Sequence, residues 1–155
     1  MVHRVLDRSG LDPSDLWLEI TETALIEEQE VTFQALASLE RLGVGLVIDD
    51  FGIGFSSLNR LRQLPPVQAV KIDKLFIDGI LLHAADRAIV AAAISLAAAL
   101  DAATVAEGVE SADQVGALLE LGCELAQGYL FSRPKPPEAF EEMLRPGRDP
   151  SLNVA

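Results

Sequence analysis

Short apolar runs alternate along the chain with longer stretches that have helical spacing. The apolar runs cover residues 16–20, 44–48, 67–72, 103–106 and 123–126. Runs of this length, apolar at most positions, are typical of strands buried in a parallel sheet. Five such strands separated by helices predict a series of βαβ units, and so an α/β fold with five or six mainly parallel strands.

The predicted helices lie between and after these runs. They cover residues 28–42, 88–100, 111–121 and 138–144. Gly43 and Gly122 are placed to end two of them, because glycine readily takes the left-handed conformation found at helix C-termini. Ser111 and Gln114 form the pattern of a capping box, which predicts that a helix begins there.

Polar side chains gather at or just beyond the C-terminal ends of the predicted strands. They are Glu19, Glu22, Asp49, Asp50, Lys71, Asp73, Glu107, Glu110 and Gln127. In a parallel α/β barrel these strand ends form one rim, and active sites are built there. We therefore predict that these side chains contribute to a single site.

Carboxylates dominate this set, whereas His3 and His83 lie away from every strand end. Oxygen ligands suit Mg²⁺, Mn²⁺ or Ca²⁺ rather than zinc. Such metals neutralise phosphate oxygens and activate water, often in pairs about 3.5–4 Å apart. Lys71 lies within an apolar strand and needs a nearby anion, because an unpaired buried ammonium is very costly.

Each of these residues also has a purely structural explanation. Asp49 and Asp50 could start a turn or cap a helix. Lys71 and Asp73 could form an ion pair on one face of a strand. The glutamates at the other strand ends could be solvated loop residues. Four further residues are expected to pack in the core: Trp17, Cys123, Tyr129 and Phe131.

Composition narrows the class of protein. The 155 residues suffice for one domain of ordinary size, and half of them are hydrophobic. The 24 Asp and Glu residues against 12 Lys and Arg give a net charge of -12, which argues against binding to a nucleic-acid polymer. A single cysteine fits a reducing compartment. The apolar run at 88–100 is too short to span a membrane, and no signal peptide precedes it, so a cytoplasmic location is expected.

Five motifs, read in order, resemble the EAL domain of bacterial cyclic di-GMP phosphodiesterases. They are LEITE (18–22), DDFGIGFSS (49–57), KID (71–73), AEGVE (106–110) and QGYLFSRP (127–134). The resemblance covers residues 1–145 as a partial EAL domain and leaves 146–155 as a loose tail. It implies a TIM-like (βα) barrel in which two Mg²⁺ or Mn²⁺ ions on the rim promote hydrolysis of cyclic di-GMP to pGpG.

The resemblance also implies roles for individual residues. Metal ligands are expected at Glu19, Asp49, Asp50 and Glu107. Lys71 matches the lysine that orients or activates the attacking water, and Glu107 joins it as a catalytic residue. Substrate binding or loop support is expected of the remaining set: Glu22, which supports the DDFG loop, Asp73, Glu110 and Gln127.

The sequence also departs from the family pattern. Ile53 and Phe55 replace the usual Thr and Tyr, and Pro66 resembles a one-residue insertion. The family's first strand carries the Glu-Ala-Leu signature, and its second carries a metal-ligating asparagine. Neither strand has a counterpart here, since residues 1–10 resemble the helix that follows them. The expected barrel is therefore incomplete.

Two functions follow as hypotheses. The first is a cyclic di-GMP phosphodiesterase, impaired or inactive as this chain alone. The second is a non-catalytic remnant that binds cyclic di-GMP or a protein partner. A homodimer or larger assembly is expected, because an open barrel exposes sheet edges. Within residues 88–100, Ala92, Ala93 and Ala97 form a small-residue face suited to close helix packing.

Overall fold

The computed structural model describes residues 1–21, 24, 29–53, 61 and 63–143. Glu22, with its expected role in supporting the DDFG loop, lies outside the described residues, as do Phe55 and the tail at 146–155. The domain boundary near residue 145 therefore stays a prediction.

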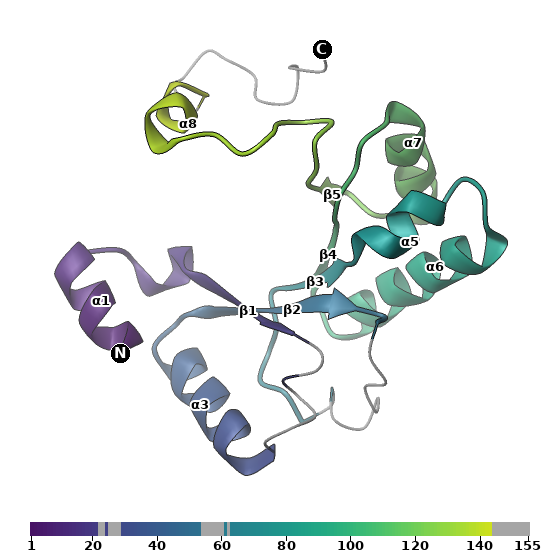
Figure 1. Ribbon diagram of the computed structural model, residues 1–155. Coiled ribbons are helices and arrows are strands. Elements are labelled where there is room, and N and C mark those ends of the chain that lie inside the picture. The colour runs from purple at the N-terminus through teal and green to yellow at the C-terminus, as the bar shows by residue number, and fades with distance from the viewer. Residues whose placement is uncertain (22–23, 25–28, 54–60, 62, 144–155) are drawn as a thin grey trace.

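Five parallel strands form one sheet, and each lies beside the next strand of the chain (Figure 1). Their bounds are β1 (Trp17–Thr21), β2 (Gly45–Phe51), β3 (Ala69–Ile72), β4 (Ala103–Ala106) and β5 (Leu125–Ala126). Parallel strands adjacent in chain order are the arrangement of consecutive units of a (βα) barrel. The predicted α/β class and parallel sheet are confirmed.

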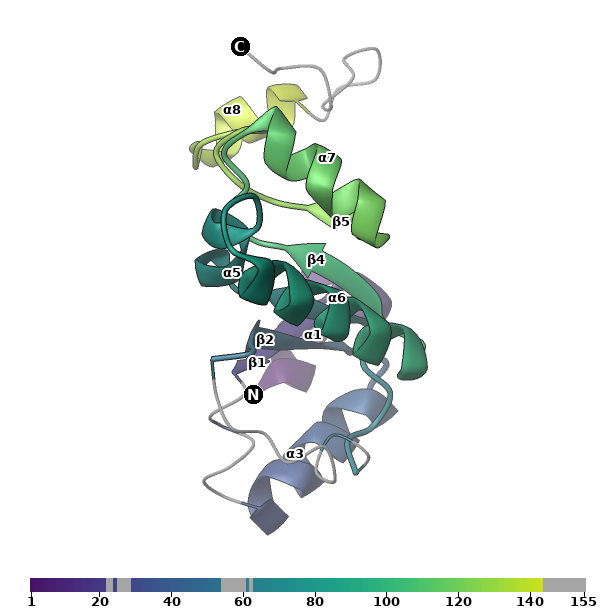
Figure 2. The ribbon, with the colours of Figure 1, turned by 90° about the vertical axis from the view of Figure 1, so that its right-hand side faces the viewer.

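Helices lie between the strands in the chain. The helical elements are α1 (Val2–Ser9), the short 3₁₀ helix η1 (Pro13–Asp15), α3 (Gln29–Arg41), α5 (Lys74–Gly79), α6 (Ala84–Ala99), α7 (Ala112–Leu121) and α8 (Pro137–Met143). Helix α6 packs in front of β3 and β4 in Figure 2. The predicted stops and starts are confirmed at α7. Gly122 has a left-handed φ of 90° there, and Ser111 with Gln114 completes a capping box.

Strand alternation divides the side chains between two environments. Ile48, Val70 and Ile72 are fully buried and pack in the two core clusters with residues of the helices. Since successive strand residues point to opposite faces, Glu19 and Lys71 lie on the other face. The helix-facing side is therefore the core, and the opposite side is free to carry charge.

Two alanines of helix α6 are buried against the sheet of this chain. Ala93 and Ala97 are 1% and 0% exposed and lie in the core clusters. Small side chains allow the helix to approach its own sheet closely. The expectation that both alanines form a face for association with another helix is wrong, and of that set Ala92 is exposed.

Two aromatic side chains expected in the core are exposed instead. Trp17 is 49% exposed because it lies on β1, which has one strand neighbour among the described residues. Tyr129 is 54% exposed, and the Arg133 guanidinium lies 4.6 Å from its ring centre. Cys123 is buried as expected, and Phe131 packs partly against the core.

Among the helices of the described residues, none combines the length and the apolar character that crossing a membrane requires.

Candidate functional site

Lys71 lies at the centre of an acidic cluster on the charged face of the sheet. Its Nζ is 2.8 Å from Glu19 Oε1, 3.0 Å from Asp49 Oδ1 and 2.6 Å from Glu107 Oε1. The three acids come from β1, from β2 and from the residue that follows β4, whereas Lys71 belongs to β3. Three carboxylates thus surround Lys71, which confirms the prediction that this buried lysine has an anion nearby.

The end of β2 is irregular at the two adjacent aspartates. The register between β2 and β3 shifts between Ile48 and Phe51, and Asp50 has a positive φ of 56°. In a regular strand Asp49 and Asp50 would point to opposite faces. A bulge with one left-handed residue redirects the chain, and aspartate tolerates that conformation better than most residues. Both carboxylates can therefore serve the same site.

A carboxylate set suited to a metal ion lies at this point. One ligand atom from each of Asp49, Asp50 and Glu107 lies within 4.8 Å of the others. Asp49 Oδ1 is buried, and the Lys71 ammonium contacts it at 3.0 Å. Lys71 shares its single positive charge with Glu19 and Glu107 as well, so the carboxylates of the cluster outnumber this cation. The donor set therefore fits a divalent cation with a preference for oxygen ligands.

The charges of the cluster shift the pKa values of its members. Burial alone would lower the pKa of Lys71, but its contacts with Glu107, Glu19 and Asp49 outweigh this and raise the pKa above that of an ordinary lysine. Burial raises the pKa of Glu107 against the opposing effect of Lys71, and the Asp49 and Glu19 charges add to the rise. Burial and the neighbouring Asp49 charge also raise the pKa of Asp50. Lys71 is therefore fully protonated at neutral pH.

Gln127 extends the cluster to the last strand. Its Nε2 donates to Glu107 Oε1 over 2.7 Å, and its backbone N–H donates to the Ala106 carbonyl oxygen over 2.8 Å. Glu107 thus contacts both Lys71 and Gln127. The structure brings together residues at five strand ends, as the sequence predicts, and their individual roles remain proposals.

Asp73 and Glu110 lie beside the cluster and have other partners. Asp73 Oδ1 accepts from Leu75 N over 2.7 Å and so caps α5. The sequence allowed an ion pair between Lys71 and Asp73, but in the structure Lys71 pairs with the three acids around it instead. Glu110 is paired with Lys74 at 2.8 Å.

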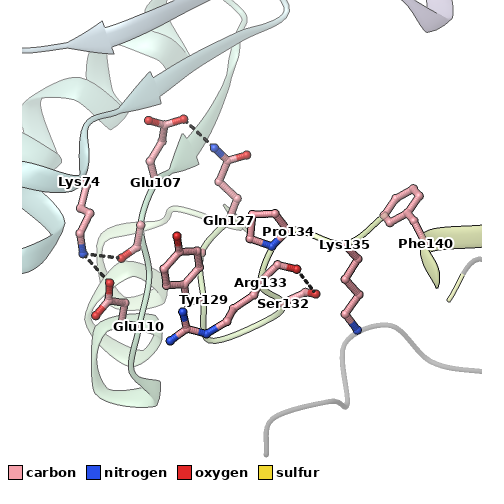
Figure 3. A pocket seen from close by; sticks show the side chains of 12 residues that line it. Lys74, Glu107, Glu110, Gln127, Tyr129, Ser132, Arg133, Pro134, Lys135 and Phe140 are labelled. Atoms are coloured by element: carbon pink, nitrogen blue, oxygen red, sulfur yellow. Dashed lines mark hydrogen bonds and ion pairs between the residues drawn. The ribbon is translucent and has the colours of Figure 1, made fainter. Parts of the chain in front are cut away.

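A cleft of about 610 Å³ opens next to Glu107 and Gln127 (Figure 3). Its lining includes the cations Lys74, Arg133 and Lys135 together with the rings of Tyr129 and Phe140. Sequence reasoning singled out neither the cations nor Phe140. The QGYLFSRP motif places Arg133 close to Tyr129 and could have indicated that arginine, whereas no motif contained Lys74, Lys135 or Phe140.

Comparison with known proteins places these residues in a family. The model of the EAL domain matches residues 1–134. The cyclic di-GMP phosphodiesterase NbdA of Pseudomonas aeruginosa is 48% identical over 144 residues, which cover 93% of this chain and 18% of NbdA. This chain therefore spans less than a fifth of the length of that relative.

Solved structures agree with this match. The PaMucR phosphodiesterase in complex with c-di-GMP superposes with a TM-score of 0.85 at 42% identity, covering 90% of this chain and 56% of that one. Klebsiella pneumoniae BlrP1 in a manganese/cy-diGMP complex has a TM-score of 0.79 at 34% identity, covering 86% of this chain and 34% of that one. The match to the family model includes the acidic strand ends from Glu19 to Gln127. The chain belongs to the EAL domain family.

Proposed function

We propose that this chain is part of a cyclic di-GMP phosphodiesterase, which hydrolyses the cyclic dinucleotide to pGpG. Membership of the EAL family supports the proposal, as does the relative NbdA, which is a cyclic di-GMP phosphodiesterase. The overall acidity of the chain is compatible with an anionic substrate if bound cations neutralise the rim.

One observation carries the proposal. Asp49, Asp50 and Glu107 offer three ligand atoms within 4.8 Å of one another. We assign Asp49, Asp50 and Glu107, with Glu19 beside them, to the binding of Mg²⁺ or Mn²⁺. When bound, such ions neutralise phosphate oxygens and lower the pKa of water.

Lys71 and Gln127 would act on the reacting groups next to these carboxylates. The protonated Lys71 donates hydrogen bonds and can orient water or stabilise charge on a phosphate oxygen. Gln127 holds Glu107 through its Nε2, and its amide oxygen could accept from water or substrate. Glu110 and Asp73 fall to supporting roles, because their carboxylates are engaged with Lys74 and with the start of α5.

The cleft beside Gln127 suits one nucleotide of the substrate. Tyr129 presents an exposed ring against which a base could stack, and Arg133 lies over the same ring. Lys74 and Lys135 supply positive charge on the cleft wall. The cleft adjoins the acidic cluster, so a base held there would place its phosphate near the proposed metal ligands.

We further propose that the 155-residue chain by itself is impaired or inactive in hydrolysis. Glu19 is half-exposed, and the family's glutamate and asparagine ligands have no match among its residues. An incomplete oxygen shell holds metal loosely, and misplacing a reacting water by about 1 Å can cost on the order of a hundredfold in rate. Binding of cyclic di-GMP without turnover would favour the alternative of a non-catalytic binding module.

Association with a second copy is also proposed. Among the described residues, β1 and β5 each have a strand neighbour on one side, and the exposed Trp17 and Leu125 lie on them. Open edges and exposed apolar side chains favour pairing with another chain. Light scattering should show a dimer or larger species that Trp17→Lys or Leu125→Glu weakens. A concentration-independent monomer would refute this.

The central test is metal and substrate binding by the purified chain. Titration with Mn²⁺ should show binding that Asp49→Asn abolishes, and cyclic di-GMP should bind in its presence. Formation of pGpG is then measured against an intact EAL protein. Absence of both Mn²⁺ and cyclic di-GMP binding would refute the proposal. Turnover close to that of the intact protein, abolished by Asp49→Asn, would refute the proposed impairment alone.

A further inference from the structure

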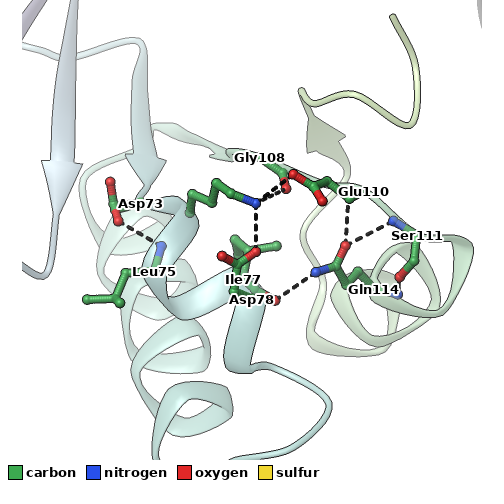
Figure 4. Close-up of polar contacts among 9 residues, drawn as sticks. Asp73, Leu75, Ile77, Asp78, Gly108, Glu110, Ser111 and Gln114 are labelled. Atoms are coloured by element: carbon green, nitrogen blue, oxygen red, sulfur yellow. Dashed lines mark hydrogen bonds and ion pairs between the residues drawn. The ribbon is translucent and has the colours of Figure 1, made fainter. Parts of the chain in front are cut away.

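Gln114 is buried where three pieces of the chain meet: α5, the turn between β4 and α7, and the first turn of α7 (Figure 4). The residue is 8% exposed. Its side chain makes three hydrogen bonds. Nε2 donates to the Ile77 carbonyl oxygen over 3.1 Å. Oε1 accepts from the backbone N–H groups of Glu110 over 2.8 Å and of Ser111 over 3.0 Å. One amide therefore ties the three pieces together.

The turn at residues 107–111 carries Glu107 of the acidic cluster and Glu110 beside it. Different groups hold its two ends. At the sheet end, Glu107 N donates to Ile72 O and Val109 N donates to Gln127 O, each over 3.0 Å. At the far end, the N–H groups of Glu110 and Ser111 are held by the Gln114 side chain. The sheet therefore positions one end of the turn, and Gln114 positions the other.

Helix α5 follows the strand of Lys71 and packs against the same turn. The helix begins at Lys74, three residues after Lys71, and Asp73 caps it. Lys74 Nζ lies 2.8 Å from both Glu110 Oε1 and Asp78 Oδ1. Gly108 has a φ of 67°, and a Cβ there would collide with the Lys74 side chain. The turn thus packs closely against the start of α5, while Gln114 holds it to Ile77 near the end of that helix.

The chemistry of Gln114 separates this tie from ordinary helix capping. A glutamate at this capping-box position would accept from the same two N–H groups. It would offer no donor to the Ile77 carbonyl, and its charge would repel that oxygen. Capping of α7 needs only an acceptor at this position, whereas the bond to the Ile77 carbonyl oxygen also needs a donor. The amide of Gln114 provides both.

We propose that Gln114 is a positioning residue of the acidic site. By holding α5 against the far end of the 107–111 turn, it sets Glu110 against Lys74 and completes the support of the turn whose sheet end carries Glu107. Its importance for turnover rests on the proposed phosphodiesterase function, whereas its hold on the turn does not.

The test compares three variants of the full chain. Gln114→Met removes all three side-chain hydrogen bonds at similar size. Gln114→Glu keeps the two acceptor bonds and loses the donor to Ile77. Ser111→Ala is the control, because it removes the cap that Ser111 Oγ provides to Gln114 N over 3.2 Å and leaves the amide in place. Hydrogen exchange of the Glu110 and Ser111 amides and Mn²⁺ affinity are measured for each, and the same substitutions in an intact EAL protein provide kcat and KM.

We expect Gln114→Met to speed exchange at the Glu110 and Ser111 amides by about tenfold or more, and Ser111→Ala to change it far less. Gln114→Glu should keep these amides protected. Both Gln114 variants should lower Mn²⁺ affinity by about tenfold, which is typical of lost support around metal ligands. In the intact protein kcat should fall and KM should rise, because Lys74 and Glu110, which Gln114 holds together, line the proposed substrate cleft.

Equal effects of Gln114→Met and Ser111→Ala on exchange would overturn the proposal, because capping alone would then explain both. Wild-type Mn²⁺ affinity in Gln114→Glu would overturn the part assigned to Ile77. If the wild-type chain binds no Mn²⁺, the proposed metal site fails, and amide exchange still decides whether Gln114 holds the turn. If Gln114→Met does not fold, the comparison of Gln114→Glu with Ser111→Ala for Mn²⁺ affinity and kcat decides.

Discussion

Lys71 Nζ lies 2.6 Å from Glu107 Oε1, and the two residues come from neighbouring strand ends that are far apart in the sequence. The Lys71 side chain is 9% exposed and that of Glu107 is 16% exposed. A contact this short between largely buried charges is strong only when other groups satisfy the remaining donors and acceptors. Glu19, Asp49 and Gln127 do so here, so the pair depends on the whole cluster.

Replacing the buried aspartate should remove most metal binding. We expect Asp49→Asn to weaken Mn²⁺ binding by about 100-fold or more. Even the loss of residues that support metal ligands lowers metal affinity by about 10–100-fold. Calorimetric titration measures this. Asp7→Asn, at an exposed carboxylate of α1 that contacts His3, is the control and should leave the affinity unchanged. Equal affinities for both variants would contradict the assignment of Asp49.

Removing the central cation should destabilise the fold in the absence of metal. Lys71→Met leaves the carboxylates of Glu19, Asp49 and Glu107 close together without their counter-ion. We expect the free energy of unfolding, measured with urea in the presence of EDTA, to fall by about 2–3 kcal/mol. The loss is smaller than for a fully buried unpaired charge, because Glu19 is half-exposed. Added Mn²⁺ should restore part of the loss.

Lys74→Met serves as the control for that measurement. Lys74 also pairs with two carboxylates, but its side chain is 44% exposed. Exposed ion pairs contribute about 0–1 kcal/mol. A loss as large as that of Lys71→Met would show that burial of the cluster is not the cause.

The raised pKa of Lys71 predicts an alkaline dependence of stability. The folded state binds this proton more tightly than the unfolded state, whose ordinary lysine pKa is 10.5. The stabilisation by Lys71 is therefore fully present below that pH and is lost as the pH rises above it, by about 1.4 kcal/mol per pH unit. The difference in unfolding free energy between wild type and Lys71→Met should shrink between about pH 10 and pH 11.5. A difference that is constant over this range would contradict the prediction.

Two glycines should respond in opposite directions to alanine. A Cβ at Gly128 would collide with the backbone oxygen and nitrogen of Val109, next to Gln127. We expect Gly128→Ala to cost about 1–3 kcal/mol, as overpacking does, and to displace Gln127 from Glu107. Gly116 lies within α7 with nothing within 4 Å of its Cβ position. Gly116→Ala should instead stabilise by about 0.5–1 kcal/mol. Thermal or urea unfolding measures both, and similar effects would contradict the close packing at Gly128.

The local pattern of the sequence was sufficient for the element types. Apolar runs, glycine stops and the Ser111–Gln114 box predicted the strands and helix ends that are observed. Boundaries moved by a few residues: α6 begins at Ala84 rather than at 88, and β5 is limited to two residues. Exposure was less predictable, as Trp17 and Tyr129 show, because it depends on which chain segment covers each ring.

The sequence by itself determined the α/β class, the parallel strand series and the gathering of acids at strand ends, because side-chain periodicity and helix signals are local. Only the tertiary structure decided which acids surround Lys71, how the bulge at Asp50 turns two adjacent carboxylates to one site, and that Gln114 joins α5 to the turn after β4. These contacts join residues from different strands and helices. Their geometry depends on register and packing, which no local stretch of the chain specifies.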